Sequence, residues 1–436
     1  MIQILYNFAC VKHIPQFLIS APSSGSGKTS ISAGLMEVLS KEGFKVQPFK
    51  CGPDYIDTKF HQKACNRASV NLDSFMATPE HIKEIYGRYS SDAEVVIVEG
   101  MMGLFDGYSR WKGSAAEIAS IIGLPVILVV DAKSAAYSIA PLLKGFINFH
   151  DGVKISGVIF NKVGSLRHKK MLEEVCSDLD IPALGFIPKS EKMENGSRYL
   201  GLDFSNLKGR EGIAEIIREN VDVERLIKIT QRPLQKSTGA VERDPRKVLV
   251  ARNEESFSFI YQEHLDNFKN VTFFNPEEEF EIPADTDLLY LPGGYPEKHL
   301  KELSKKTMKS VKEYAEKGGK ILAECGGMIY LCNSILTDER RVPLTGVLPY
   351  TVTSKKENRK LSLGYRSFTL NGVTFKGHEF HYTKFEEPQP KSIIEVFDAR
   401  GNKTETPVMR VKNTIASYTH LYWGEEDIFK IFQPDE

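Results

Sequence analysis

The chain has 436 residues, of which 41% are hydrophobic, and its 57 basic residues balance 57 acidic ones. A single hydrophobic core stops growing at about 250–300 residues, so this length predicts two domains. A net charge of zero gives no basic field that would attract nucleic acid or anionic lipid. Six cysteines without a CxxC pair indicate a reducing compartment, with neither a disulfide framework nor a structural zinc site. We therefore expect small-molecule partners, with no nucleic acid and no membrane among them.

The first ten residues are apolar, but they carry no basic start and no small-residue cleavage site. Nowhere in the sequence does an apolar run reach the length that spans a bilayer. The sequence therefore predicts a cytoplasmic protein with a loose N-terminal leader. The oligomeric state is not fixed by these patterns, and a homodimer stays open.

Short apolar runs alternate with helix-like stretches in the first half of the chain. Continuous β-branched runs, in contrast to alternating ones, are typical of strands covered on both faces. They predict a parallel sheet with crossover helices, the first of which spans residues 29–40. The expected strands lie at residues 17–19, 45–49, 95–98, 126–130 and 157–160.

A second α/β series follows a polar stretch that contains proline and glycine. We place a nucleotide-binding domain at residues 16–228, a linker at 229–246 and a second domain at 247–432. The fold class is therefore α/β with two domains, the second ending in a β-rich tail. Its expected strands lie at residues 248–250, 271–274, 288–291 and 320–323.

A glycine-rich segment, residues 22–29, lies between the first expected strand and the first expected helix. Its glycines let backbone amides turn inward, and the helix start adds partial positive charge. Lys28 would neutralise phosphate and the Thr29 hydroxyl would reach Mg²⁺. Pro22 stands where the usual motif has its first glycine, and an ordinary strand-to-helix turn is the alternative. The expected nucleotide-binding residues are Gly25, Ser26, Gly27, Lys28, Thr29 and Ser30.

Carboxylates at the ends of neighbouring strands are expected to complete this site. Glu99 follows the apolar run at 95–98, so it emerges at the carboxyl edge of the sheet, where such folds bind ligands. Asp54 and Asp57 lie in a glycine-proline turn and could point into one cleft or cap a helix. We assign Thr29, Asp54 and Glu99 to the metal and Asp57 to the substrate, although the individual roles of the aspartates stay open.

Two further polar residues follow strands of the first domain. Asp106 is assigned to the substrate, but beside Gly107 it could equally be a turn residue. Asn161 ends the strand at 157–160 and could hydrogen-bond the nucleotide base or form a simple turn.

Residues 318–328 predict a buried strand that stops at Cys325, followed by a tight glycine turn and a helix. A helix start lowers the pKa of a thiol, and backbone amides there can stabilise an oxyanion. The glycine pair at 293–294 ends another strand and could supply a second amide. His420 is the best candidate for the general base, although a lone cysteine is more often an inert core residue.

His378 and His381 have a spacing that resembles a pair of metal ligands. Without a third clear ligand they are weak support for zinc, so we expect substrate contact or ordinary packing. We assign no transition metal.

Several segments resemble the cobyrinate a,c-diamide synthase family, and the resemblance covers nearly the whole chain after Gln16. It implies an amino-terminal domain like dethiobiotin synthetase and a carboxyl-terminal class I glutamine amidotransferase domain of the cobalamin-pathway type. It also implies that Cys325 is the glutaminase nucleophile and that His420 raises its nucleophilicity. Tyr422 stands where the wider glutaminase class has a glutamate. The segments that carry the resemblance are residues 21–29, 52–57, 98–107, 377–381 and 416–420.

The resemblance implies a ligase of cobalamin biosynthesis that amidates the a and c acetates of cobyrinate, a tetrapyrrole. ATP, Mg²⁺ and L-glutamine would be needed, and each carboxylate would pass through an acyl phosphate. One alternative is the same reaction on nickel sirohydrochlorin in a related pathway. A regulatory P-loop ATPase that binds a protein partner is an alternative of another class, but it leaves Cys325 and His420 without a role.

Overall fold

The computed structural model describes residues 12–190, 193, 212–235 and 242–433. Two compact units divide the chain. The first comprises Met1–Ser74 and Thr78–Ala240, and the second comprises Phe75–Ala77 and Val241–Glu436. Among the helices of the described ranges, none combines the length and apolar composition that crossing a bilayer requires.

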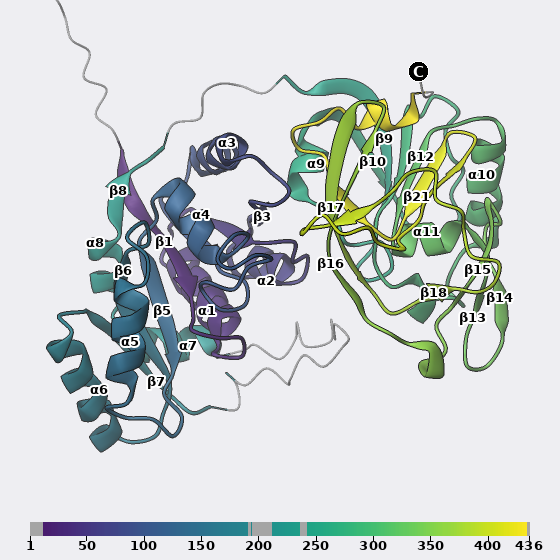
Figure 1. Ribbon diagram of the computed structural model, residues 1–436. Helices are drawn as coiled ribbons and strands as arrows, with labels where there is room; N and C mark the ends of the chain where they lie inside the picture. The colour runs from purple at the N-terminus through teal and green to yellow at the C-terminus, as the bar shows by residue number, and fades with distance from the viewer. Residues whose placement is uncertain (1–11, 191–192, 194–211, 236–241, 434–436) are drawn as a thin grey trace, which may run out of the picture. The chain divides into compact units, whose positions relative to one another are not determined.

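The first unit contains the expected parallel sheet, with strands in the order β3-β2-β4-β1-β5-β6-β7 (Figure 1). The sequence patterns missed β3 and β7, the strands at the two ends of this order. The bounds are β1 (His13–Ser20), β2 (Val46–Cys51), β3 (Val70–Leu72), β4 (Val95–Glu99), β5 (Val126–Asp131), β6 (Ile155–Val163) and β7 (Ala183–Pro188).

Crossover helices connect these strands. Ile31, Leu35 and Leu39 lie four residues apart on α1 and share one side of it, where they pack with Ile97 and Val129 of the sheet. Serine or threonine side chains cap α3, α4 and α6, each accepting a hydrogen bond from an N–H group in the first turn. The helices are α1 (Lys28–Lys41), α2 (Asp57–Cys65), α3 (Pro79–Ser90), α4 (Ala115–Ile122), α5 (Ile139–Asn148), α6 (Leu166–Asp178), α7 (Ile213–Asn220) and α8 (Val223–Ile229).

The segment expected to be a linker contains regular structure at both ends. Gln231–Pro233 forms β8, which pairs antiparallel with β1. Gln16 of β1 strengthens this pairing, because its side-chain amide donates to the carbonyl oxygens of Arg232 at 3.0 Å and Pro233 at 3.2 Å. Strand β9 already begins at Asp244. Strands therefore occupy residues 231–233 and 244–246 of the segment that the sequence pattern assigned to a linker.

The second unit is built on the sheet β10-β9-β11-β12-β21-β20, parallel except for β20. Two four-stranded sheets, β14-β13-β15-β18 and β19-β16-β17-β22, make up the expected β-rich tail. The strands are β9 (Asp244–Ala251), β10 (Phe268–Phe274), β11 (Leu288–Leu291), β12 (Ile321–Glu324), β13 (Cys332–Leu336), β14 (Arg341–Pro343), β15 (Leu348–Thr353), β16 (Ser362–Leu370), β17 (Val373–His381), β18 (Lys384–Phe385), β19 (Phe397–Asp398), β20 (Val408–Val411), β21 (Thr414–Ser417) and β22 (His420–Tyr422). The helical segments are α9 (Gln262–Asp266), η2 (Pro296–Lys298), α10 (Lys305–Glu316), α11 (Gly326–Leu331), η3 (Lys356–Asn358) and η4 (Ile428–Phe432).

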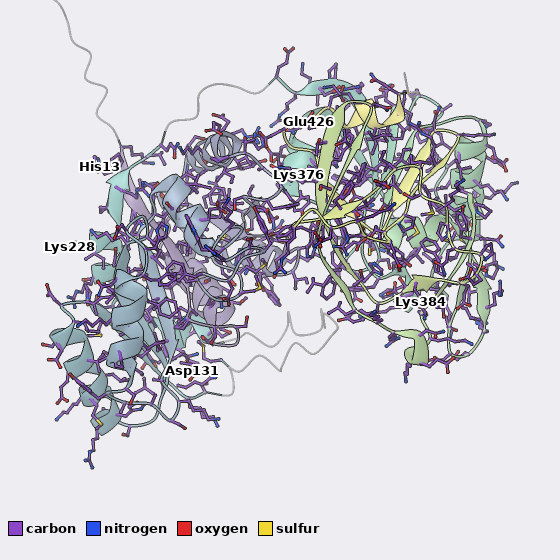
Figure 2. All side chains as sticks on the ribbon, viewed as in Figure 1. His13, Asp131, Lys228, Lys376, Lys384 and Glu426 are labelled. Carbon is purple, nitrogen blue, oxygen red and sulfur yellow. The ribbon has the colours of Figure 1, made fainter. Side chains whose placement is uncertain are left out.

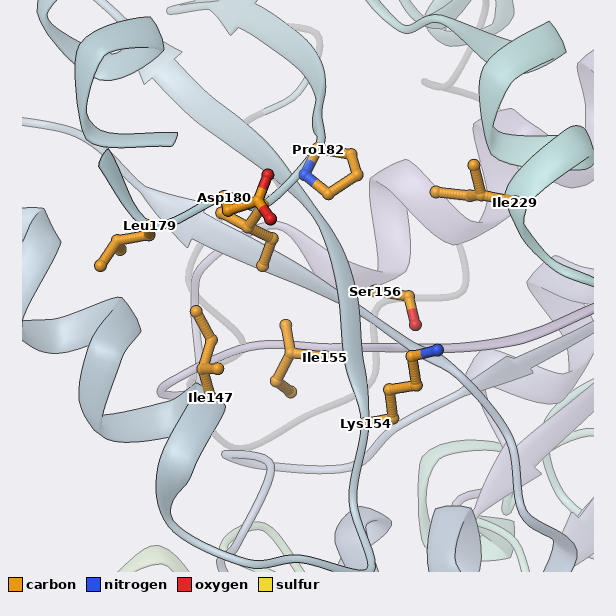
Figure 3. A pocket seen from close by; sticks show the side chains of 9 residues that line it. Ile147, Lys154, Ile155, Ser156, Leu179, Asp180, Pro182 and Ile229 are labelled. Atoms are coloured by element: carbon orange, nitrogen blue, oxygen red, sulfur yellow. The ribbon is translucent and has the colours of Figure 1, made fainter. Parts of the chain in front are cut away.

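A cavity of about 260 Å³ lies in the first unit, shown with its nine lining residues in Figure 3. Lys154 and Pro182 of its lining directly precede β6 and β7, so the cavity lies at the amino ends of these strands. The glycine-rich loop follows the carboxyl end of β1. Because the strands are parallel, the cavity is at the opposite edge of the sheet, and it contains none of the expected site residues.

Candidate active site

The glycine-rich loop joins β1 to α1 as the sequence predicted. Gly27 has φ +99°, and a Cβ atom there would collide with the amide of Asn161, so glycine is required at this position. The Lys28 ammonium donates to the carbonyl oxygen of Ser23 at 3.2 Å, and the Ser26 hydroxyl donates to the same oxygen at 3.0 Å. The Lys28 side chain therefore folds back over its own loop. Its ammonium lies where a phosphate bound by the loop could contact it.

Lys28 is buried, and its pKa is correspondingly low. Burial is the main cause and the positive charge of Lys50 is the next, and together they lower the pKa of Lys28 to about 8. The negative charges of Glu99, Asp57 and Asp106 act in the opposite direction. Burial destabilises the charged form of Lys28, and an incoming phosphate would stabilise it again. The interaction free energy gained from the phosphate is therefore larger for Lys28 than for an exposed lysine, whose charge water already stabilises.

Thr29 lies beside two buried carboxylates. Its hydroxyl is 2.7 Å from Glu99 Oε1 and 3.3 Å from Asp57 Oδ2. Lys50 donates to the same two oxygens, at 2.7 Å to Asp57 and 2.9 Å to Glu99. Burial raises the pKa of Glu99, but the positive charge of Lys50 and the hydrogen bond with His61 together outweigh burial and hold this pKa below its usual range. Glu99 is therefore a carboxylate paired with the Lys50 ammonium.

His61 completes the cluster from helix α2. Its Nε2 is 2.6 Å from Glu99 Oε2, and its Nδ1 is 2.9 Å from the hydroxyl of Ser69. The ring therefore holds one oxygen of Glu99, while the other faces Thr29 and Lys50. Sequence reasoning missed Lys50 and His61. The spacing of Asp57 and His61, four residues apart on one helix, could have indicated the second of them.

The structure places the two aspartates of the glycine-proline turn differently from our assignment. Asp57, assigned to the substrate, lies at Thr29 and Glu99, where we expected a metal ligand. Asp54 Oδ1 instead accepts the backbone N–H groups of Ile56 at 2.8 Å and Asp57 at 3.0 Å, which is the helix-capping alternative. Asp57 is therefore the better candidate for the metal.

Asp106 and Asn161 both hold the loops around this site. Asp106 Oδ2 accepts the N–H of Gly103 at 3.0 Å, as a turn residue would, yet its charge also acts on Lys28. The Asn161 amide nitrogen donates to the carbonyl of Ser26 at 3.0 Å, and its oxygen accepts the N–H of Lys162 at 2.9 Å. These bonds favour a role in positioning the phosphate loop over the expected contact with the base.

Two other expected or neighbouring groups occupy the same edge of the sheet. The Ser30 hydroxyl donates to the carbonyl of Met193 at 3.4 Å, which anchors α1. Asp131, labelled in Figure 2, ends β5 and pairs with the Lys162 ammonium at 2.6 Å. This edge therefore carries several polar groups beyond the glycine-rich loop.

The residues at Thr29 fit a magnesium ion. One hydroxyl oxygen and two carboxylate oxygens converge there. The Lys50 ammonium bonds to both carboxylates, so these oxygens already bind a cation. Mg²⁺ keeps several waters and is usually held by one or two carboxylates together with substrate phosphates. Within the described ranges, no three His, Cys, Asp or Glu side chains form a metal site by themselves. The donor set therefore suits Mg²⁺ shared with a nucleotide.

Cys325 forms a strained turn between β12 and α11. Its φ of +43° and ψ of −105° are rare for a residue with a side chain, and such strain clusters at functional sites. Its backbone N–H donates to the carbonyl of Ser417 at 2.8 Å, and its sulfur lies 3.9 Å from the carbonyl oxygen of Phe380. The predicted order of strand, cysteine and helix is confirmed, but Gly326 and Gly327 are the first residues of the helix and do not form a separate turn.

The expected low thiol pKa is wrong for this structure. Burial is the main cause that raises the pKa of Cys325 well above its usual value, and the negative charge of Glu297 adds to it. The N–H of Gly326 acts in the opposite direction. Helix α11 has only six residues, so its dipole is too small to overcome burial.

The glycine pair at 293–294 packs against His420 on one side and against the start of α11, next to Cys325, on the other. A Cβ atom on Gly293 would collide with the His420 ring, and one on Gly326 would lie 2.5 Å from the carbonyl oxygen of Gly294. Both glycines are therefore needed for this close approach. Burial first, and the nearby histidines second, lower the pKa of His420 to about 3. The site therefore rests as a neutral thiol and a neutral imidazole, with the glycine turn between them.

The comparisons with known proteins agree with this geometry. The CobQ/CobB/MinD/ParA nucleotide binding domain family matches residues 17–200, and the CobB/CobQ-like glutamine amidotransferase domain family matches residues 248–428. The cobyrinate a,c-diamide synthase of Caldanaerobacter subterraneus is 38% identical to this chain, over 93% of this chain and 94% of that protein. The hydrogenobyrinate a,c-diamide synthase of Brucella abortus is 36% identical, over 93% and 98%. The chain belongs to the a,c-diamide synthase family.

As a member of this family, the protein is an enzyme: a ligase of the glutamine amidotransferase type with a nucleotide-binding domain. Among solved structures, chloroplast FtsY from Physcomitrella patens matches 41% of this chain and 60% of its own, with 17% identity and a TM-score of 0.33. That likeness is too weak to support an argument.

In this a,c-diamide synthase family member, Glu324 connects the segment that contains Cys325 to the segment that contains His420. Sequence reasoning missed Glu324. The Glu324 carboxyl group accepts the Tyr290 hydroxyl at 2.8 Å and the N–H of Leu421 at 3.1 Å. Glu324 directly precedes Cys325, and Leu421 directly follows His420. Burial raises the pKa of Glu324 to about 8, so it is mostly protonated at neutral pH.

The remaining residues around His420 are aromatic or neutral. Tyr422, which stands where the wider class has a glutamate, donates its hydroxyl to the buried Glu263. His378 lies opposite His420 on β17. His381 donates its Nδ1–H to the carbonyl of Thr383 at 2.8 Å and stacks on the ring of Tyr418 at 3.6 Å. Packing therefore accounts for His381, one of the two alternatives that the sequence left open.

Proposed function

We propose that this protein amidates the a and c acetate carboxylates of cobyrinate, using ATP and glutamine, in cobalamin biosynthesis. The observation that carries the proposal is the packing of the Gly293–Gly294 turn against both His420 and Gly326, the residue after Cys325, on a chain that also has a phosphate loop with a Thr29–Asp57–Glu99 cluster. The names of the relatives support the substrate, since they are cobyrinate and hydrogenobyrinate a,c-diamide synthases. A regulatory ATPase leaves the amidotransferase match at residues 248–428 unexplained.

The nucleotide site would activate the acid. A carboxylate resists attack because its charge repels nucleophiles and its oxygen is a poor leaving group. In the proposed step a carboxylate oxygen of the substrate attacks the γ-phosphorus of ATP, ADP leaves, and an acyl phosphate forms. Lys28 and the amides of the loop would hold the phosphates. Mg²⁺ bound at Thr29, Asp57 and Glu99 would supply neutralisation of the phosphate charge.

The cysteine site would supply the nitrogen. The Cys325 sulfur attacks the side-chain amide carbon of glutamine while His420 accepts the thiol proton and passes it to the departing nitrogen. Ammonia and a thioester result, and water then hydrolyses the thioester to glutamate. Because both groups are neutral at rest, the proton would move during the attack itself. Ammonia attacks the acyl phosphate, phosphate leaves, and the cycle repeats at the second acetate.

The experiment that tests the proposal separates the two nitrogen sources. Cys325→Ser should abolish amidation with glutamine and retain amidation with an added ammonium salt, because only ammonia release needs the thiol. Lys28→Ala should suppress amidation with both donors and spare part of the glutamine hydrolysis. Mass spectrometry of the product, after incubation with ATP, Mg²⁺ and either cobyrinate or hydrogenobyrinate, counts the carboxylates converted to amides.

Equal loss of both nitrogen donors in Cys325→Ser would contradict the assignment of the second domain. Amidation retained by Lys28→Ala would contradict the role of ATP. A wild-type protein that converts hydrogenobyrinate but not cobyrinate would move the assignment to the first of these substrates.

A further inference from the structure

Glu297 lies beside the nucleophile turn. It belongs to the short helix η2, which follows the Gly293–Gly294 turn directly. Pro296 of η2 packs against the start of α11, since a Cβ atom on Gly326 would lie 2.8 Å from Pro296 Cδ. Glu297 is therefore placed next to Cys325 by the same close packing that brings the glycine turn to the cysteine.

The Glu297 carboxylate has an unsatisfied oxygen. The residue as a whole is partly exposed, but Oε2 is buried and has no hydrogen-bond partner among the described residues. Two other buried acids near the thiol are compensated differently. Glu324 has both oxygens hydrogen-bonded. Glu379 also has a buried oxygen, Oε1, without a partner among the described residues, but its charge is compensated by the Arg366 guanidinium at 2.6 Å from Oε2. Of the three, Glu297 acts most strongly on Cys325.

An unpaired carboxylate at this place costs stability and opposes the chemistry. A buried carboxylate oxygen without a partner has lost the hydrogen bonds that water gave it. Burial raises the pKa of Glu297 to about 7, against its own backbone N–H first and then the positive charges of Lys298, Arg359 and His299, so the group is partly ionised at neutral pH. Its charge also raises the pKa of the Cys325 thiol and so disfavours the thiolate. Both costs disappear when a cation reaches Oε2.

Glutamine carries such a cation. With its side-chain amide at the Cys325 sulfur, the α-ammonium of the same molecule is the positive group that enters the site together with the reacting atom. We infer that Glu297 binds the α-ammonium of glutamine, and that it selects α-amino acid amides over simple amides. This rests on the proposed glutaminase function. Binding would pair the buried carboxylate and remove its repulsion of the developing thiolate in one event.

The test compares two reagents that alkylate the thiol. The first, 6-diazo-5-oxo-norleucine, carries the α-ammonium of glutamine and loses N₂ as its terminal carbon bonds to sulfur. The second, iodoacetamide, has no ammonium and loses iodide. Mass spectrometry of the full-length protein gives the labelling rate at Cys325 for each reagent. Glu302→Gln, an exposed glutamate a few residues further along, is the matched control.

Glu297→Gln should slow labelling by the norleucine reagent about tenfold or more, because a charge-assisted hydrogen bond is worth about 1.5–3 kcal/mol. Labelling by iodoacetamide should stay the same or become faster, since the negative charge beside the thiol is gone. Glu302→Gln should match the wild type with both reagents. Equal slowing of both reagents in Glu297→Gln would show a structural role and overturn the inference.

A measurement on the wild-type protein needs no variant. Glutamine should protect Cys325 from iodoacetamide, and glutaramate, the same amide without the α-amino group, should protect at least tenfold less well at equal concentration. Equal protection by the two compounds would overturn the inference. If the norleucine reagent does not label wild-type Cys325 at all, the proposed glutaminase function fails. If it labels wild type and Glu297→Gln equally fast, only the role of Glu297 fails.

Discussion

The two candidate sites bury polar groups in opposite ways. At the phosphate loop, Lys50 joins Asp57 and Glu99, and His61 holds the second oxygen of Glu99, so the charges are kept because they are paired. At the cysteine turn, burial favours the neutral forms of the thiol and the imidazole.

The difference follows from what each site would receive. A nucleotide brings negative charge that only pre-existing cations can meet, so a charged cluster is ready before the ligand arrives. Glutamine is neutral overall, and charge develops at the cysteine only as its bond to carbon forms. A low-dielectric pocket in which the thiol and the imidazole are both neutral suits that order of events, provided that proton transfer accompanies the attack.

The largest effect should come from removing the cation of the charged cluster. Lys50→Met leaves Asp57 and Glu99 side by side and buried, which costs about 3–5 kcal/mol of unfolding free energy. Lys41→Met, which removes an exposed ion pair with Glu37, should cost under about 1 kcal/mol. Urea denaturation of the full-length protein measures both.

Millimolar Mg²⁺ should restore more stability to Lys50→Met than to the wild type, because a divalent ion can replace the missing ammonium. An equal response of both proteins to Mg²⁺ would contradict a metal site at Asp57 and Glu99. A cost similar to that of Lys41→Met would show that the cluster is not held by Lys50.

The neutral site should depend on shape and hydrogen bonds more than on charge. Glu324→Ala orphans the Tyr290 hydroxyl and the Leu421 N–H and should cost about 2–4 kcal/mol. Glu324→Gln should cost less than about 1.5 kcal/mol, because an amide has the same shape and the carboxyl group is already mostly protonated. Thermal and urea unfolding compare the two variants.

The pH dependence of Glu324→Gln sharpens the same point. The folded pKa of Glu324, about 8, lies above the ordinary value of 4.5. The folded state therefore binds more protons between these values, so this group's stabilisation is complete below pH 4.5 and is lost as pH rises to 8. As pH rises through this window, the unfolding free energy of the wild type should fall relative to that of Glu324→Gln by at most about 1.4 kcal/mol per pH unit. Parallel curves would show that Glu324 is ionised when folded.

The charged site should show its proton dependence in nucleotide affinity. The pKa of Lys28 is about 8, so above pH 8 the lysine must take up a proton to meet a phosphate. The dissociation constant of ATP should then rise about tenfold per pH unit above 8. Calorimetry in buffers of different ionisation enthalpy should detect the proton uptake, and Lys28→Arg should lack it. A pH-independent affinity would contradict contact between Lys28 and phosphate.

The smallest effect is expected at His420. Because the imidazole is neutral at rest, it does not hold the thiolate, so His420→Ala should change the iodoacetamide labelling rate of Cys325 by less than about threefold. The rate should keep rising with pH beyond 9, the ordinary thiol pKa. A labelling rate that reaches a plateau near neutral pH in the wild type, but not in His420→Ala, would show a thiolate–imidazolium pair. Both sites would then be charged at rest, and the contrast between them would be wrong.

Local patterns were enough for the parallel sheet, the glycine-rich loop and the cysteine turn, because strand, glycine and helix signals there are contiguous in sequence. Lys50 and His61 were missed because a charged residue in a strand or helix usually faces solvent. Only the meeting of β2, β4 and α2 shows that both side chains are paired with buried carboxylates. The helix-start argument for Cys325 failed for a related reason, since a local dipole was weighed without the burial that surrounds it.

The sequence by itself determined the two-domain α/β class and which residues could carry phosphate and thiol chemistry, since side-chain chemistry and short-range periodicity reside in the chain. The tertiary structure decided which acid stands at Thr29, which residues surround Cys325, and in what protonation state each group rests. These properties depend on burial and on neighbours from distant segments, such as Glu297 at the cysteine and Gly293 at His420. The pKa shifts and the charge pairing of the site residues could therefore be determined only from the packed structure.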